Sequence, residues 1–188
     1  MGFFRSIAAD AIELARALPA QSGAAPSAAP YRRVSVKEAV GAALTQDGYR
    51  VLLLSRARES ARRRHVPWVN HALRRLTTVL YGIEIGNEIE LGEGVTFIHT
   101  LGTVIGGTSK VGARVQFMGN NTIGTAKDDG CPVIEDEVVI GCGARVLGPL
   151  RVGRGALIGA NAVVLADVPA GAIATGIPAK IHDAKHGV

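Results

Sequence analysis

The sequence predicts a mainly β solenoid preceded by an α-helical region. Between Ile85 and Pro169 an aliphatic or aromatic residue recurs every sixth position, and a Gly follows most of these markers. A fixed short period indicates units that stack on their neighbours and bury a continuous core. Six is neither a helical period nor a simple strand period, so each unit is predicted to be a short strand followed by a tight turn. The markers are Ile85, Leu91, Phe97, Ile105, Val111, Phe117, Ile123, Ile134, Ile140, Val146, Val152, Ile158 and Val164.

The segment before the repeats has helical patterns. Residues 3–18 carry apolar side chains at helical spacing, and a linker near 19–30 of Ala, Ser, Pro and Gly follows. A capping-box motif at Ser35 predicts another helix start. Residues 49–64 and Pro67–Tyr81 predict two more helices, the second with Pro in its first turn. The packing face expected for that second helix consists of Trp68, Ala72, Leu73, Leu76, Val79 and Leu80.

We therefore divide the chain into three parts. Residues 1–80 form an N-terminal helical region that contains the linker, residues 81–181 form the solenoid, and residues 182–188 form a tail. A chain of 188 residues is long enough for one solenoid and a modest second element.

Composition narrows the classes of partner and compartment. The formal net charge is +5, and the densest basic cluster, Arg56 to His65, precedes the repeats. A solvated helix face is the favoured interpretation of this cluster, and attraction to an anionic partner is the alternative. Nucleic acid is disfavoured because no aromatic residues alternate with the basic ones. No apolar segment reaches membrane-spanning length, and two cysteines without zinc-site spacing favour a reduced, cytoplasmic chain.

Two breaks interrupt the six-residue period. The step is eight residues from Phe97 to Ile105 and eleven residues from Ile123 to Ile134. The first break follows His99, and the second releases a loop over residues 125–132 that is rich in turn-forming residues. Loops that leave a solenoid commonly carry function, so we expect both breaks to border one cleft. A tolerated surface insertion is the alternative for the loop.

Six motifs resemble those of the hexapeptide-repeat acyltransferases and, more narrowly, those of the serine acetyltransferase group. They are GIEI at 82–85, IHTLG at 98–102, IGTAKDDGCPVI at 123–134, IGCGARVLG at 140–148, IGANAVVLADVP at 158–169 and GIPAK at 176–180. The resemblance implies a left-handed parallel β-helix with three hexapeptides per coil, in which residues 85, 105, 123, 146 and 164 begin successive coils. It also implies an acetyl-CoA-dependent O-acetyltransferase that works as a homotrimer with sites between subunits.

The resemblance assigns His99 as the general base and Glu84 as the carboxylate that orients it. Transfer of an acetyl group to a hydroxyl requires removal of the hydroxyl proton, alignment of the reactants and stabilisation of the oxyanion. An imidazole can take up a proton near neutral pH, and His99 is the only His within the repeats. An ordinary surface histidine and a solvated carboxylate are the alternative interpretations.

The acceptor pocket departs from the family pattern. In serine acetyltransferases an Asp precedes the base and the loop ends in Arg-His, residues held to bind the ammonium and carboxylate of the amino acid. Ile98, Gly130 and Cys131 occupy these places here, and they cannot form such ion pairs. We therefore expect a sugar or glycan hydroxyl as acceptor, contacted by Ile98, Asp129 and Cys131. Serine in a rearranged pocket is the alternative within the class.

For coenzyme A, the resemblance implies a groove between neighbouring prisms along the late coils. The candidate contacts are Gly141, Ala144, Ala160, Ala162 and Lys180, the last for the nucleotide phosphates. No metal is expected, because the zinc enzyme with this type of prism needs three His ligands and the coils contain only His99. The non-enzyme alternative is a structural or regulatory trimer without turnover.

Overall fold

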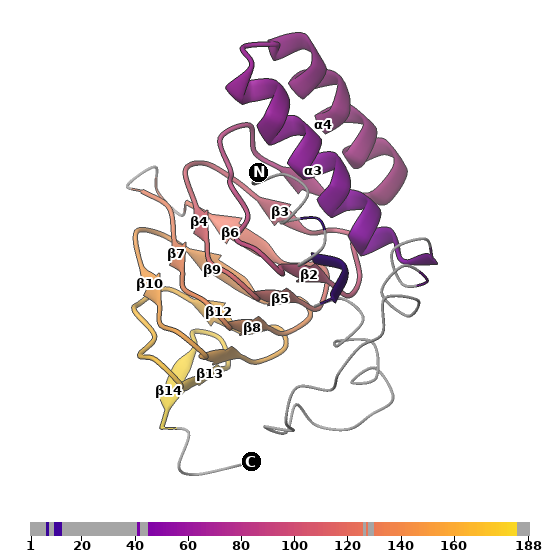
Figure 1. The fold of residues 1–188 in the computed structure, drawn as a ribbon. Coiled ribbons are helices and arrows are strands. Elements are labelled where there is room, and N and C mark those ends of the chain that lie inside the picture. The colour runs from indigo at the N-terminus through magenta and orange to yellow at the C-terminus, as the bar shows by residue number, and fades with distance from the viewer. Residues whose placement is uncertain are drawn as a thin grey trace.

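The chain winds into a three-sided prism with a pair of helices across one end (Figure 1). This computed structural model describes residues 7, 10–12, 41, 45–125, 127 and 130–183. Residues 7 and 10–12 are helical, whereas the linker near 19–30, the capping motif at Ser35 and the tail residues 184–188 lie outside the described residues.

Short strands form the three faces of the prism. Sheet A contains β1 (Glu84–Ile85), β3 (Val104–Ile105), β6 (Thr122–Gly124), β9 (Arg145–Leu147) and β12 (Val163–Val164). Sheet B contains β4 (Lys110–Val111), β7 (Val133–Ile134) and β10 (Arg151–Val152). Sheet C contains β2 (Thr96–Phe97), β5 (Gln116–Phe117), β8 (Val139–Ile140), β11 (Leu157–Ile158), β13 (Ile173–Thr175) and β14 (Lys180–His182). All pairs are parallel except β13 with β14.

The register of sheet A confirms the predicted coil starts. Each marker pairs with the marker of the next coil, in the order Ile85, Ile105, Ile123, Val146 and Val164. All five side chains are buried, because the period places them on the inner face of every coil. The predicted mainly β solenoid is therefore confirmed.

The interior of the prism also holds aromatic rings. Phe97 and Phe117 pair across β2 and β5, and their rings stack with centroids 5.1 Å apart. Full burial of such a side chain contributes about 1.5–3 kcal/mol, so the stack of markers stabilises a solenoid whose strands are only two or three residues long.

Two described helices precede the prism, α3 (Asp47–Arg63) and α4 (Pro67–Tyr81). They confirm the helices predicted over 49–64 and Pro67–Tyr81. Pro67 opens α4, and Gly82 ends it with a φ of 61°, a left-handed conformation that glycine adopts readily. Within the described ranges, no helix is long and apolar enough to cross a membrane.

The packing face predicted for α4 is wrong. Trp68, Leu76, Val79 and Leu80 are 73, 42, 81 and 60 % exposed, whereas the polar residues Asn70 and Thr77 are buried. The prism and α3 cover only one side of the helix, and these two polar residues lie on that side. The other side forms an exposed apolar stripe, defined by Trp68, Leu76, Val79 and Leu80.

Arginines of α3 close the open end of the solenoid. The first coil has no preceding coil to pair with its carbonyl oxygens, and unpaired buried backbone groups are costly. Arg56 donates to the carbonyl oxygens of Leu91 and, at 2.7 Å, of Gly92, and Arg58 donates to that of Gly86 at 3.0 Å. Both side chains are buried, so the interpretation of the basic cluster as a solvated helix face is wrong for these two residues.

Asp10, in the N-terminal segment, forms an ion pair and a hydrogen bond at this end of the prism. Its carboxylate is 1 % exposed, pairs with Arg56 at 3.1 Å and accepts the backbone N–H of Gly94 at 2.8 Å. Unpaired, either charge would be strongly destabilising when buried, and together they are mutually satisfied.

Burial of the charged groups on α3 shifts two pKa values. Desolvation, followed by the charges of Arg74 and Arg62, lowers the pKa of Arg58 to about 10. Desolvation also raises the pKa of Glu59, although the adjacent Arg56 opposes that rise. The end of the solenoid is therefore closed by charged groups that have given up part of their hydration.

Candidate active site

The turns that lead from sheet C to sheet A stack into one edge of the prism, which we call the His99 edge. It consists of residues 98–103, 118–121, 141–144 and 159–162, one turn per coil. Residues 176–179, which lead from β13 to β14 within sheet C, form a fifth turn that is hydrogen-bonded to Val163 of sheet A. Backbone hydrogen bonds join neighbouring turns, for example from Asn120 to Leu101 at 3.0 Å and from Asn161 to Cys142 at 2.9 Å. The edge is therefore a continuous column, and His99 lies in its first turn.

His99 is exposed, and its backbone rests on Gly119 of the next coil. A Cβ built on Gly119, whose φ is 118°, would lie 2.8 Å from the His99 Cβ. Only glycine permits this close approach in this conformation. The buried Asn121 fixes the position of Gly119, because its Oδ1 accepts the Gly119 N–H at 3.1 Å and its Nδ2 donates to the Gly141 carbonyl at 2.7 Å. Gly119, against which the His99 backbone packs, is thus positioned by hydrogen bonds that extend to the next coil.

Glu84 lies on sheet A beside the turn that carries His99. Its backbone N–H donates to the carbonyl oxygen of Thr103, the last residue of that turn, at 2.9 Å. Its carboxylate pairs with Arg74 of α4 at 3.0 Å. Among the residues that the structure describes, no hydrogen bond joins the His99 ring to Glu84, so the orienting role of Glu84 stays a prediction.

Residues expected to contact coenzyme A follow the same edge. Gly141 and Ala160 lie in its third and fourth turns, and Lys180 is exposed at the start of β14, just after the fifth turn. Ala144 and Ala162 are 0 % exposed, so only their backbone groups could lie beside the pantetheine arm, and that close approach stays a prediction. Both point into the core because they occupy the second inward position of their repeats.

The two sequence breaks lie on different edges of the prism. The break beside Ile98 and His99 falls between sheets C and A, whereas the loop over 125–132 leaves between β6 of sheet A and β7 of sheet B. The expectation that both border one cleft is therefore wrong within a single chain. The half-buried Ile98 is anchored by its N–H, which donates to the Phe117 carbonyl at 2.9 Å.

Of the loop residues expected to touch the acceptor, Asp129 lies outside the described residues. Cys131 is half-buried, and its Sγ packs so closely against Gly107 that a Cβ built on Gly107 would overlap it. Cys131 and the exposed Cys142 are both free thiols. In the described ranges, no group of three or more His, Cys, Asp or Glu side chains is arranged to hold a metal ion.

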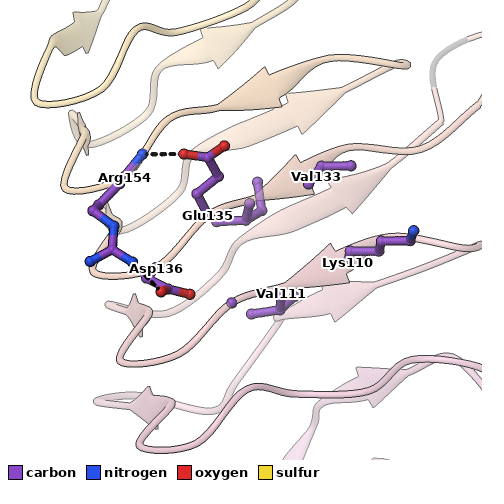
Figure 2. Close-up of a pocket in the computed structure, with 8 residues that line it drawn as sticks. Lys110, Val111, Val133, Glu135, Asp136 and Arg154 are labelled. Carbon is purple, nitrogen blue, oxygen red and sulfur yellow. Dashed lines mark hydrogen bonds and ion pairs between the residues drawn. The ribbon is translucent and has the colours of Figure 1, made fainter.

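A hollow of about 430 Å³ opens on sheet B and involves none of the predicted site residues (Figure 2). Arg154 contacts both acidic side chains that line the hollow. The backbone N–H of Arg154 donates to Glu135 at 2.8 Å, and the Arg154 guanidinium pairs with Asp136 at 2.6 Å. The hydrogen bond from the Arg154 N–H, followed by that from the Arg151 guanidinium, lowers the pKa of Glu135. The two acidic side chains of the hollow are therefore paired with arginines. Its lining consists of Lys110, Val111, Gly112, Val133, Ile134, Glu135, Asp136 and Arg154.

The residues that support His99 were missed at the level of the sequence, although the period contains a signal for them. His99 stands two places after the marker Phe97, and the same offset from the later sheet C positions gives Gly119, Cys142, Ala160 and Gly176. Residues at one offset stack along one edge, so the repeat itself identifies what lies beneath His99.

Comparison with known proteins gives two similarities in sequence. Residues 131–166 match the family described as bacterial transferase hexapeptide (six repeats). Over 140 residues the chain is 39% identical to the serine acetyltransferase of Helicobacter pylori (strain J99 / ATCC 700824), an alignment that covers 73% of this chain and 82% of that protein.

Solved structures extend the similarity to most of the fold. The serine acetyltransferase of Neisseria gonorrhoeae superposes with a TM-score of 0.82 at 26% identity, over 97% of this chain and 68% of that one. A serine acetyltransferase solved in complex with CoA gives a TM-score of 0.80 at 27% identity, over 96% of this chain and 69% of that one. These similarities confirm the left-handed parallel β-helix with an N-terminal helical region.

Proposed function

Because the chain belongs to the hexapeptide-repeat acyltransferases, in the serine acetyltransferase-like group, we propose that it transfers the acetyl group of acetyl-CoA to the hydroxyl of serine. The coarser activity, acetyl-CoA-dependent O-acetyl transfer, follows from the relatives, one of which was solved with CoA. The sugar or glycan acceptor expected from the loop sequence gains no support from these relatives, which are named for serine.

In the proposed reaction His99 acts as the general base. Its imidazole takes the hydroxyl proton of serine while the hydroxyl oxygen attacks the thioester carbonyl carbon of acetyl-CoA. The tetrahedral intermediate then expels the thiolate of coenzyme A, which recovers the proton from the imidazolium. The products are O-acetylserine and coenzyme A. The exposure of His99 on a column of turns joined by backbone hydrogen bonds is the observation that carries this proposal.

Glu84 remains the candidate for orienting His99. Its carboxylate forms an ion pair with Arg74, and its backbone N–H donates a hydrogen bond to Thr103, the last residue of the His99 turn. A carboxylate bonded to one ring nitrogen would leave the other nitrogen free to accept the substrate proton. In this proposal α4 contributes to the site indirectly, because Arg74 fixes the approach of that carboxylate.

We further propose that the active unit is a homotrimer with sites between subunits. Two features support a second copy. The apolar stripe of α4 continues to Leu101, which is 72 % exposed two residues after His99 and faces Gly82 at the end of α4. The loop over 125–132 lies on a different edge from His99, so only a loop from another subunit could border the same cleft.

The test compares the wild-type chain with His99→Ala, using acetyl-CoA and L-serine and measuring release of free thiol. We expect the substitution to lower kcat by about 10²- to 10⁴-fold, the usual contribution of a general base. Coenzyme A affinity, measured by calorimetry, should change little. Unchanged turnover would reject His99 as the base, and transfer to nucleotide sugars in preference to serine would reject the acceptor.

A further inference from the structure

Arg145 extends from sheet A toward the turn that carries His99. It opens β9, and its guanidinium reaches back to the preceding coil, where it donates to the backbone oxygen of Asn120 and, at 3.3 Å, to the side-chain Oδ1 of Asn120. That Oδ1 faces Gly102 in the His99 turn, because a Cβ built on Gly102 would lie 2.9 Å from it. A single side chain therefore separates the guanidinium from the turn of the candidate base.

The surroundings of Arg145 differ from those of the other arginines of the prism. Arg114, Arg151 and Arg154 pair with Glu137, Glu135 and Asp136 respectively. The contacts of Arg145 are to uncharged oxygens of Asn120 and Ala144, and within the described part of the chain no carboxylate pairs with it. Arg145 thus places a partly buried positive charge directly after the third turn of the His99 edge, and no carboxylate among the described residues neutralises it.

A guanidinium without a carboxylate partner is suited to bind one. Its five N–H donors lie in one plane and match the two oxygens of a carboxylate. The hydrogen bonds to Asn120 fix its orientation and leave further N–H groups for a ligand. The group is therefore already ordered before an anion arrives, which lowers the entropy cost of binding.

We propose that Arg145 binds the carboxylate of the acceptor amino acid, taking over the function of the loop arginine that is replaced by Gly130 in this chain. The inference rests on the proposed function, because it assumes that the acceptor is serine. Arg145 lies two coils after the His99 turn, but its guanidinium reaches back to Asn120, so along the prism axis about one coil spacing of about 4.8 Å separates it from that turn. Arg145 also extends toward the early coils, away from Lys180, the candidate for the coenzyme A phosphates.

The experiment compares Arg145→Gln with wild type on two acceptors, L-serine and L-serinamide, in which a neutral amide replaces the carboxylate. We expect kcat/KM for serine to fall by about 10- to 100-fold, the range for losing charge-assisted hydrogen bonds. The value for serinamide and the KM for acetyl-CoA should change by less than about threefold. Arg145→Lys, which keeps the charge without the planar fork, should recover part of the loss. Arg154→Gln, on another edge, is the matched control and should leave both acceptors unaffected.

The outcomes separate this inference from the proposed function. Equal losses on serine and serinamide would mean that Arg145 only maintains the turn, and a raised KM for acetyl-CoA would assign the guanidinium to a phosphate; either result overturns the inference. If wild type acetylates serine and Arg145→Gln keeps the same preference for serine over serinamide, the inference alone fails. If wild type acetylates neither acceptor, the proposed function fails and the inference falls with it.

Discussion

Substitution of Gly119 by Ala tests whether the proposed chemistry depends on the support beneath His99. The new Cβ would lie 2.8 Å from the Cβ of His99 and 3.3 Å from its carbonyl oxygen. Carbon atoms in contact prefer about 3.5–4.0 Å, so the His99 turn must move by about 1 Å. A displacement of that size can lower the rate about 10²-fold when it affects a reacting group. We therefore expect kcat to fall by about two orders of magnitude.

Stability must be separated from activity in this variant. Alanine at a φ of 118° adds backbone strain of about 1–3 kcal/mol, and the steric contact adds a similar amount. The matched control is Gly155→Ala, because Gly155 has a φ of 67° and no atom within 4 Å of a built Cβ. That variant should lose about 1–2 kcal/mol of stability and retain its kcat.

The assay is thiol release from acetyl-CoA at saturating acceptor, combined with thermal unfolding followed by circular dichroism. Temperatures well below both unfolding midpoints ensure that only folded protein is compared. If Gly119→Ala is destabilised but keeps the wild-type kcat, the position of His99 does not govern the reaction and the assignment of the base is wrong.

Three further predictions concern the ends and faces of the prism. Asp10→Asn removes the charge partner of the buried Arg56 and should lower the free energy of unfolding by about 3–5 kcal/mol in chemical denaturation. Glu135 has a lowered pKa in the folded chain, so its contribution to stability is present above its unfolded pKa and is lost as pH falls through the folded value. Wild type should consequently lose more thermal stability on acidification below about pH 4.5 than Glu135→Gln. Val79→Asp places a charge in the apolar stripe of α4 and should reduce the mass of the assembly measured by sedimentation.

Each of these predictions has its own control and failure. Asp47→Asn, in an exposed ion pair with Arg50, should have little effect on stability. An equally small effect of Asp10→Asn would show that the buried ion pair of Asp10 with Arg56 does not stabilise the fold. Parallel pH profiles for wild type and Glu135→Gln would show that Glu135 does not stabilise the fold. An unchanged assembly mass for Val79→Asp would exclude the apolar stripe as a subunit contact.

The coils were predictable because the six-residue period reports burial directly. Ile85, Ile105 and Ile123 mark the inner face whatever packs outside the prism, and each falls on its predicted partner. The packing of α4 was not predictable in this way. A helix with apolar residues on one side and Asn70 and Thr77 on the other favours burial of the apolar side, yet the prism covers the polar one.

The candidate site shows the same division. The position of His99 beside a break in the period was evident from the sequence, and the family resemblance gave the expectation that Gly130 stands in place of an arginine. The separation of His99 from the loop also follows from the predicted coil starts, because one break ends at Ile105 and the other begins after Ile123; the expectation of one shared cleft overlooked this. The contact of Arg145 with Asn120 was not evident, because it depends on the side-chain conformation of Arg145 in the stacked coils.

The sequence by itself determined the repeating unit, the order of the coils and the residue types available for chemistry, since those depend on spacing along the chain. Tertiary structure alone decided which side chains form hydrogen bonds between neighbouring coils, which arginines of α3 are buried and which face of α4 stays exposed. The physical reason is that stacking and end closure bring together groups from different coils, and their desolvation and pairing are set by neighbours that are remote along the chain.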